Sequence, residues 1–238
     1  MKRRLVETGD GSHSLYVDEL KEHYHSWNGA LEESRHVYLG HGWEVVKTRF
    51  SPEAPLHVLE IGLGTGLNAL LTLLAADREI YYTAIEAYPV TPEEAALLNY
   101  PELIGEAGAR EAFTDLHAAP LNSWHELRPG FHLYKHTGLI EDYTAENEFH
   151  LVYFDAFAPN KQPHLWENPI FANMHRAMQA GARLTTYCAK GAVRRSLQAL
   201  GFQVTRQPGP PGKREMLVAD RVAQTPPDEA PEATKPTQ

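Results

Sequence analysis

Apolar, β-branched segments alternate with helix-forming segments from residue 56 onward, and this alternation restricts the fold more than any other feature of the sequence. The pattern predicts strands at residues 57–61, 80–85, 151–154, 183–187, 202–206 and 215–219, and helices at residues 66–76, 168–178 and 192–200. Strands that alternate with helices form a mostly parallel sheet covered on both faces. Only the loop PGPPG at residues 208–212 separates the last two strands, which indicates an antiparallel hairpin. The sequence therefore predicts an α/β fold with a doubly wound, mostly parallel sheet and an antiparallel C-terminal hairpin.

Composition divides the chain into three parts. Residues 1–50 are rich in His, Tyr and Trp, and we expect them to form an N-terminal extension packed on the core. The loop segment SPEAP follows, and residues 51–221 carry the alternation and form the predicted core domain. Residues 222–238 are rich in Pro, Ala, Thr and acidic residues, so we predict a disordered tail.

The sequence favours a cytoplasmic protein without disulfides, metal or membrane segments. Cys188 is the only cysteine, so no intramolecular disulfide can form, and a reducing compartment is expected. The start MKRRLVE becomes polar too early for a secretory signal, and nowhere do about 18 apolar residues run together. The 13 histidines lack a cysteine or carboxylate cluster at metal-ligand spacing, so we predict no metal site.

Positive charge is concentrated near the C-terminus of a chain whose formal net charge is −9. Residues 181–221 hold eight Lys and Arg residues against two acidic residues, a local net charge of +6 that leaves −15 for the remainder. Because the local field governs association, such a chain can still bind a nucleic acid. The candidate phosphate-contacting residues are Lys190, Arg194, Arg195, Lys213 and Arg214. A solvated helix face is the alternative interpretation.

The segment EIGLGTGLN at residues 60–68 follows a predicted strand and begins a predicted helix, which is the context of a nucleotide-binding turn. Gly62, Gly64 and Gly66 let the backbone turn tightly and approach a ligand closely, and the helix N-terminus adds N–H donors. Glu86 lies twenty residues after Gly66, at the end of the next predicted strand, where a carboxylate can accept hydrogen bonds from two ribose hydroxyls.

Two positions favour S-adenosylmethionine over a dinucleotide in this turn. A dinucleotide site would place glycine at residue 67, where this sequence has leucine. Glu60, two residues before Gly62, suits a ligand with a cationic sulfonium and ammonium rather than a pyrophosphate. A nicotinamide-dependent oxidoreductase and an ordinary turn with structural glycines remain the alternatives.

The segment FDAFAPNKQPHLW at residues 154–166 follows a central strand, where open α/β sheets bind their ligands. It resembles the strand-end signature of the MnmC methyltransferase domain, Asp-x-Phe-Ala-Pro-x-x-x-Pro-x-x-Trp. Three further segments, residues 29–38, 62–70 and 193–217, resemble other blocks of that family in the same order. The resemblance covers about residues 10–220.

The resemblance implies a Rossmann-like class I methyltransferase with a seven-stranded sheet. The implied function is S-adenosylmethionine-dependent methylation of the 5-aminomethyl group of wobble 2-thiouridine in tRNA. The implied cofactor-binding residues are Glu33, Glu60, Gly62, Gly64, Gly66, Asn68, Glu86 and Asp155. The chain ends before a flavin-dependent half could begin, so we expect the methyltransferase form without it. Leu139 follows Gly138 where the family often has an acid for the adenine amine, which leaves that contact unassigned.

Asp155 and Phe157 are the candidate catalytic residues of this resemblance. At its reference pKa of about 3.9, an aspartate is about six units too acidic to deprotonate a lysine-like ammonium with a pKa of about 10.4. We therefore expect Asp155 to orient the amine and to stabilise positive charge on its nitrogen. Phe157 is positioned to stack on a flipped uridine, with a core position as the alternative, and Trp166 is expected to pack.

Two further functions stay open at this point. A methyltransferase of this type can act on a small amine or a protein instead of tRNA. A non-catalytic RNA-binding module that has lost its cofactor is the other, for which the only support is Leu139. The oligomeric state and the tRNA species are not assigned.

Overall fold

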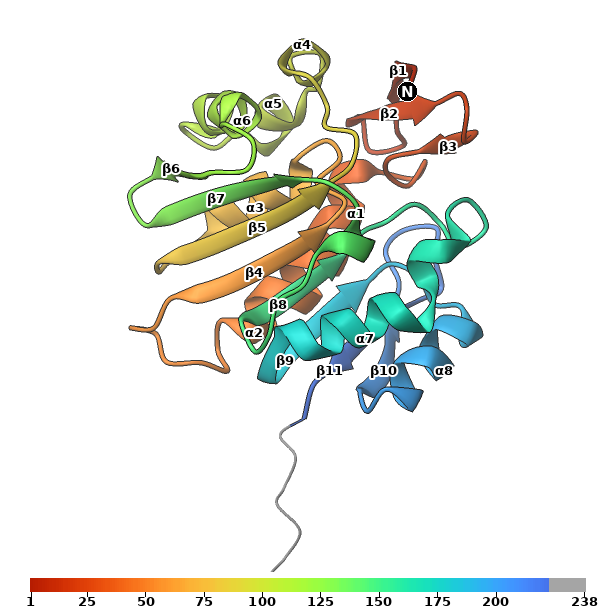
Figure 1. The fold of residues 1–238 in the computed structure, drawn as a ribbon. Coiled ribbons are helices and arrows are strands. Elements are labelled where there is room, and N and C mark those ends of the chain that lie inside the picture. Colours follow the sequence, from red (N-terminus) through yellow and green to blue (C-terminus); the bar gives the residue numbers. More distant parts are fainter. Residues whose placement is uncertain (223–238) are drawn as a thin grey trace, which may run out of the picture.

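The computed structural model describes residues 1–222 and contains an eight-stranded central sheet (Figure 1). Its strands are β4 (Leu56–Ile61), β5 (Ile80–Glu86), β6 (Trp124–Arg128), β7 (Phe131–Thr137), β8 (Phe149–Phe154), β9 (Met178–Thr186), β10 (Gln203–Pro208) and β11 (Glu215–Asp220). The spatial order is β10-β11-β9-β8-β4-β5-β7-β6. The five central strands are parallel, whereas β10 and β11 at one edge and β6 at the other run antiparallel to their neighbours.

Helices cover both faces of this sheet (Figure 1). They are α1 (Ala30–Ser34), the π-helix η1 (Arg35–Trp43), α2 (Glu44–Val46), α3 (Leu67–Ala75), α4 (Pro92–Ala95), α5 (Tyr100–Ile104), α6 (Ala109–Ala118), η2 (Ile140–Asp142), η3 (Pro163–Trp166), α7 (Asn168–Ala177) and α8 (Gly191–Ala199). Side chains of η1, α3 and α6 pack on one face, and those of α7 and α8 pack on the other.

Successive residues of the central strands point to opposite faces. In β4, Val58 belongs to the core beneath α3, and Leu59 belongs to the core beneath α7. In β8, Tyr153 belongs to the core beneath α3 and Phe154 to the core beneath α7. Because both faces are buried, these strands are continuously apolar rather than alternating, which is why they stand out in the sequence.

The strand order creates an opening at the carboxyl ends of the strands. Within the sheet, β5 and β7 lie on one side of β4, and the later strands β8 and β9 lie on its other side. Ligands of open α/β sheets bind at such a reversal, outside the carboxyl ends of the strands. The turn after β4 and the residues after β8 meet there, because the N–H of Asp155 donates to the carbonyl of Ile61 at 3.0 Å.

The structure confirms the α/β class, the mostly parallel sheet and the C-terminal hairpin. The predicted count of seven strands is wrong, because the structure has eight in the central sheet. The edge strand β6 reads WHELR and is mostly exposed, so it lacks the apolar run that marks the buried strands. Thr91 caps α4 with a capping box, in which the N–H of Glu94 donates to the hydroxyl of Thr91 and the carboxylate of Glu94 accepts from the N–H of Thr91.

Residues 1–50 form two kinds of structure. The first is a small antiparallel sheet of β1 (Arg3–Glu7), β2 (His13–Val17) and β3 (Glu22–His23), which Figure 1 shows beyond the carboxyl ends of the parallel strands. The second comprises α1, η1 and α2, whose Trp43 is completely buried in the main core. Residues 223–238, which make up nearly all of the predicted tail, lie outside the described residues.

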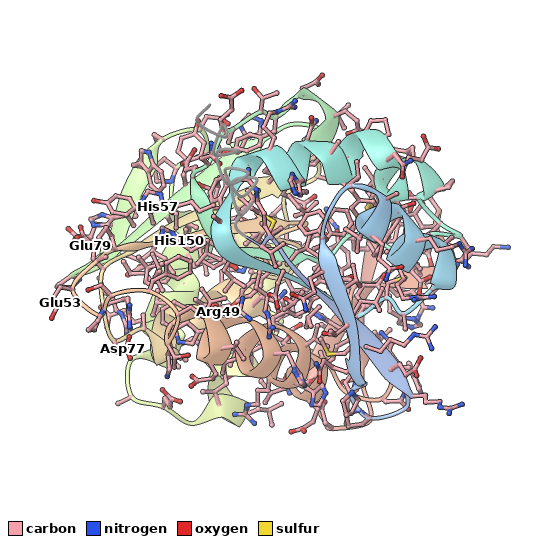
Figure 2. All side chains as sticks on the ribbon, turned by 90° about the horizontal axis from the view of Figure 1, so that it is seen from below. Arg49, Glu53, His57, Asp77, Glu79 and His150 are labelled. Carbon is pink, nitrogen blue, oxygen red and sulfur yellow. The ribbon has the colours of Figure 1, made fainter. Side chains whose placement is uncertain are left out.

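The opposite end of the sheet carries a polar cluster. Figure 2 views this end, where His57 and His150 lie near the starts of β4 and β8 and the backbone N–H of His57 donates to Nδ1 of His150 at 3.0 Å.

Across residues 1–222, no group of three or more His, Cys, Asp or Glu side chains is arranged to hold a metal ion. None of the helices in the same range combines the length and apolar character that crossing a membrane requires.

Replacing Phe171 with alanine should strongly destabilise the protein, because this side chain is 1% exposed and packs between α7 and the sheet. The expected loss in the free energy of unfolding is about 3–5 kcal/mol, measured by urea denaturation followed by far-UV circular dichroism. Leu103→Ala on α5 removes a side chain that is 41% exposed and should change stability by less than about 1 kcal/mol. Equal losses in the two variants would contradict this packing.

Candidate active site

A cavity of about 510 Å³ opens at the carboxyl ends of the parallel strands. Most of its wall comes from the ends of β4, β5, β7 and β8 and the residues after them, and from the segment that begins in β3. These are residues 61–65, 85–88, 138–141, 155–158 and 22–27, and the other lining residues are Met1, Glu33, Gln162, His164, Leu165, Tyr187 and Lys213. Five of the lining side chains are carboxylates, whereas Lys213 is the single lysine in the lining. A cavity of this size and charge suits a small cationic ligand.

The turn after β4 requires glycine at two positions in the cavity wall. Gly62 has a φ of +86°, and a Cβ atom there would lie 2.8 Å from the carbonyl oxygen of Asp155. Gly64 has a φ of +52°, and a Cβ atom there would lie 2.8 Å from the ring of Tyr24. The turn thus touches both the end of β8 and the N-terminal sheet. Gly66, the N-cap of α3, packs against α6 and does not line the cavity.

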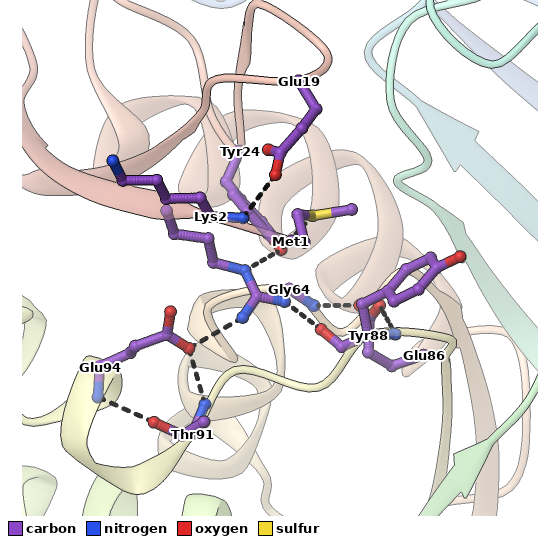
Figure 3. Close-up of polar contacts among 10 residues, drawn as sticks. Met1, Lys2, Glu19, Tyr24, Gly64, Glu86, Tyr88, Thr91 and Glu94 are labelled. Atoms are coloured by element: carbon purple, nitrogen blue, oxygen red, sulfur yellow. Dashed lines mark hydrogen bonds and ion pairs between the residues drawn. The ribbon is translucent and has the colours of Figure 1, made fainter.

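Glu86 lies at the end of β5 as expected, and its carboxylate is held in place by two backbone groups (Figure 3). Its oxygens accept hydrogen bonds from the N–H of Gly64 at 2.9 Å and from the N–H of Tyr88 at 2.8 Å. An ionised carboxylate has about four acceptor sites, so two sites stay free for the hydroxyls of a ribose. The geometry therefore fits the nucleoside-binding role predicted for Glu86.

Arg3 fixes the N-terminal sheet to this side of the cavity. Its guanidinium donates to the hydroxyl of Tyr24 and to the carboxylate of Glu94, both at 2.8 Å, and also to the carbonyl of Tyr88. Burial raises the pKa of Tyr24 to about 12, so its hydroxyl stays protonated at neutral pH. Sequence reasoning missed this contact, because no local pattern relates residue 3 to residues 88 and 94.

A second buried contact from the N-terminal part supports the turn from behind. A hydrogen bond of 2.6 Å joins Nε2 of His25 to the hydroxyl of Thr65, and Tyr100 donates to the same hydroxyl at 3.2 Å. Burial lowers the pKa of His25 to about 4, so the imidazole is neutral near pH 7. The side chains of His25 and Tyr100 thus hold the turn through the hydroxyl of Thr65.

Asp155 is the centre of a buried hydrogen-bond network. The hydroxyl of Tyr38 donates to Oδ1 at 2.5 Å, and Nδ2 of Asn68 donates to Oδ2 at 2.9 Å. The same amide nitrogen donates to Oε1 of Glu60 at 2.9 Å, and Tyr82 donates to the other oxygen of Glu60 at 2.9 Å. Both oxygens of the Asp155 carboxylate are therefore fixed in position.

The structure places Glu60 and Asn68 behind the turn rather than in the cavity wall. Glu60 is fully buried, and its side chain lies on the α3 face of β4, away from the opening. Burial raises the pKa of Glu60 well above its ordinary value. The amide of Asn68 donates to both Glu60 and Asp155 and so orients Asp155, and the contact of these residues with a cofactor stays a prediction. Tyr38, which the sequence reasoning did not select, has the same effect from η1.

The assumption that Asp155 keeps its ordinary pKa is wrong. Burial, with a smaller contribution from the carboxylate of Glu33, raises the pKa of Asp155 to about 7, and the hydrogen bonds from Tyr38 and Asn68 offset only part of this increase. The difference between the pKa of Asp155 and that of a lysine-like ammonium falls from about six units to about three. The side chain is thus able to accept a proton from an amine far more readily than a free aspartate.

Glu33 lines the cavity, but its carboxylate already has two partners. It accepts a hydrogen bond from the N–H of Ser26 at 2.7 Å and forms an ion pair with Nζ of Lys213 at 2.5 Å. The ammonium of Lys213 also lies 4.0 Å from the ring centroid of Tyr187. The ammonium of Lys213 thus lies at the cavity, apart from the exposed cations with which it was grouped, and its contact with a phosphate stays a prediction.

The other four predicted phosphate-contacting residues lie outside the cavity. Lys190, Arg195 and Arg214 are exposed and Arg194 is half-buried. Within residues 1–222, none of these four side chains takes part in an ion pair. Helix α8 begins four residues after Tyr187, which lines the cavity.

The two aromatic residues after β8 separate in the structure. Phe157 lines the cavity, with its ring 5.0 Å from that of Tyr24 in an edge contact. Trp166 is 6% exposed and packs against Phe154, and its indole N–H donates to the carbonyl of Phe157 at 2.8 Å. Trp166 thus packs in the core, as expected, and supports the backbone that carries Phe157.

The chain matches known methyltransferases in sequence. Residues 136–222 match a family described as S-adenosyl-L-methionine-dependent methyltransferase. Over 232 residues the chain is 31% identical to the tRNA 5-methylaminomethyl-2-thiouridine biosynthesis bifunctional protein MnmC of Marinomonas sp., covering 92% of this chain and 34% of that protein. The protein of the same name from Leptospira borgpetersenii is 30% identical over 220 residues, with 84% and 32% covered. The chain thus spans about a third of the length of these relatives.

A solved structure shares the fold. The crystal structure of MNMC2 from Aquifex aeolicus superposes with a TM-score of 0.76 at 24% identity, covering 96% of this chain and 73% of that chain. At this identity the likeness shows the fold alone. Together with the family match it establishes the Rossmann-like class and S-adenosylmethionine as cofactor, which removes the support for the nicotinamide alternative.

Gly62→Ala should weaken the binding of S-adenosylhomocysteine by about tenfold or more, because the added Cβ collides with the backbone at Asp155. Gly105→Ala is the matched control, since Gly105 also has a positive φ, of +71°, but no atom within 4 Å of an added Cβ. It should lose stability without losing affinity. Isothermal titration calorimetry measures both variants, and equal affinities would contradict the role given to the turn.

Asp155→Asn should remove one pH-dependent contribution to the free energy of unfolding. Because the folded-state pKa of Asp155 is raised to about 7, folding favours its protonated form, and this contribution is lost as pH rises from about 4 through 7. The free energy of unfolding of the variant should therefore gain on that of the wild type over this interval, measured by urea denaturation. The exposed Asp142→Asn controls for the removal of a charge, and a pH-independent difference for Asp155→Asn would refute the raised pKa.

Proposed function

We propose that this chain, which is an MnmC-like S-adenosylmethionine-dependent methyltransferase domain, methylates the 5-aminomethyl group of wobble 2-thiouridine in tRNA. The product would be 5-methylaminomethyl-2-thiouridine. The observation that carries the proposal is an acidic cavity, lined by the fixed carboxylate of Asp155, in a chain whose exposed Lys190, Arg195 and Arg214 have no ion-pair partner among residues 1–222. The names of the relatives supply the identity of the nucleoside.

The charge distribution supports an acceptor that carries a cationic amine on a polyanionic chain. A methylated amine is cationic and is favoured by the carboxylates of the cavity, including Glu33 and Asp155. The polyanionic chain that carries this amine is favoured by the exposed cations Lys190, the N-cap of α8, and Arg195. A small amine acceptor, the second candidate, would need the cavity but not the helix.

The cavity residues fit the cofactor in a defined order. The turn at residues 62–65 and the carboxylate of Glu86 would hold the nucleoside, and Glu33 would face the ammonium of the methionine part. When bound, S-adenosylmethionine supplies a methyl group on a positively charged sulfur. Asp155 would orient the amine nitrogen toward this methyl group and take up the proton that the nitrogen loses.

Positioning residues make this role of Asp155 possible. Tyr38 and Asn68 each hold one oxygen of the carboxylate, so its remaining acceptor sites have a fixed direction toward the cavity. Phe157 would stack on the target uracil at the same end of the cavity. We assign the methyl transfer alone to this chain, so a separate reaction has to supply the 5-aminomethyl group. A tRNA acceptor would place the enzyme in the cytoplasm.

Incubating the purified chain with S-adenosylmethionine and tRNA that carries 5-aminomethyl-2-thiouridine should produce 5-methylaminomethyl-2-thiouridine, detected by nucleoside mass spectrometry. Asp155→Ala should lower the rate by about a hundredfold or more, because the amine loses its fixed carboxylate. The exposed Asp142→Ala should leave the rate unchanged. If the wild type leaves aminomethyl-bearing tRNA unmodified but methylates small amines, the second candidate replaces the first.

A further inference from the structure

Trp27 is an exposed aromatic side chain at the mouth of the cavity. It is 61% exposed, the largest exposed fraction among the large hydrophobic residues that the structure describes, and it lines the opening. Its ring lies 5.4 Å from that of His23, which contacts Tyr16 in turn. Exposing most of an indole to water is unfavourable, so such a residue at a ligand site marks a surface for a partner.

The backbone around Trp27 is fixed although the ring is exposed. The carbonyl of Trp27 accepts a hydrogen bond from the N–H of Gly9 at 2.8 Å. The preceding residue, Ser26, donates its N–H to Glu33 at 2.7 Å, and its carbonyl accepts from Gly29 at 3.2 Å. A ring presented from an ordered backbone loses little conformational entropy when a partner stacks on it.

Trp27 lies next to the basic side of the mouth. The loop between β10 and β11 packs on the residue that follows Trp27, because a Cβ atom on Gly212 would collide with the side chain of Asn28. Two residues along this loop, Arg214 is exposed and has no ion-pair partner among residues 1–222. The aromatic surface and the cationic loop therefore form one continuous region.

Trp27 lies apart from the side of the cavity that suits the nucleoside of the cofactor. The nucleoside side is built around Glu86 and Tyr88, which Arg3 links to the N-terminal sheet. Trp27 connects instead to Glu33 through the N–H of Ser26, and from there to Lys213. The indole is thus placed on the side from which an acceptor on a polyanionic chain would approach.

We propose that Trp27 stacks on an unpaired base of the RNA acceptor that neighbours the nucleotide held in the cavity. The inference rests on the proposed function and identifies how the acceptor is held. Proteins that bind single-stranded RNA combine aromatic rings, which stack on bases, with cations along the phosphates. Trp27 with His23 supplies the first element, and Arg214 with the cations of α8 supplies the second.

The test compares Trp27→Ala with Trp124→Ala in the full chain. Trp124 is 49% exposed on the edge strand β6 and does not line the cavity, so it is a matched control for loss of an exposed indole. Fluorescence anisotropy measures binding of an anticodon stem-loop RNA, and calorimetry measures binding of S-adenosylhomocysteine. Trp27→Ala should weaken RNA binding by about tenfold and leave S-adenosylhomocysteine binding within about twofold. Trp124→Ala should match the wild type in both assays.

A conservative variant separates stacking from folding. Trp27→Phe keeps an aromatic face and should retain most of the RNA affinity, and thermal melts show whether each variant is folded. Unchanged RNA binding by Trp27→Ala, or an equal loss of S-adenosylhomocysteine affinity, would overturn the inference. If the wild type neither binds nor methylates tRNA, the proposed function fails first. If the wild type methylates tRNA and Trp27→Ala binds RNA normally, only the stacking role fails.

Discussion

The contact between the glycine turn after β4 and the end of β8 determines the rest of the site. Gly62 approaches the backbone of Asp155 so closely that no side chain fits between them. The hydroxyl of Tyr38 and the amide of Asn68 fix the direction of the Asp155 carboxylate beside this contact. Desolvation of the carboxylate raises its pKa to about 7, although these two hydrogen bonds and the charge of Lys213 favour the ionised form.

The same contact separates two electrostatic environments. Inside the cavity, carboxylates predominate, and the single lysine is neutralised by its ion pair with Glu33. Outside the cavity, Lys190, Arg195 and Arg214 are exposed and have no acidic partner among residues 1–222. A cationic reacting centre on a polyanionic acceptor would match both environments, although the formal net charge of the chain is −9.

Much of the fold could be predicted from the sequence because its signals are local. Strands such as β8 are continuous apolar runs, and the glycines of the turn are required by backbone geometry at their own positions. The rest depends on distant partners. Tyr38 is 117 residues from Asp155, and Lys213 is 180 residues from Glu33, so neither pairing leaves a trace in local spacing. The reference pKa of aspartate failed for the same reason, because burial is a property of the whole fold.

The most direct test of this account is a crystal structure of the chain with S-adenosylhomocysteine bound. The account predicts that the ribose hydroxyls contact Glu86 and that the sulfur lies between the turn at residues 62–65 and the carboxylate of Asp155. A ligand bound with its sulfur remote from Asp155, or with the nucleoside away from Glu86, would contradict the account.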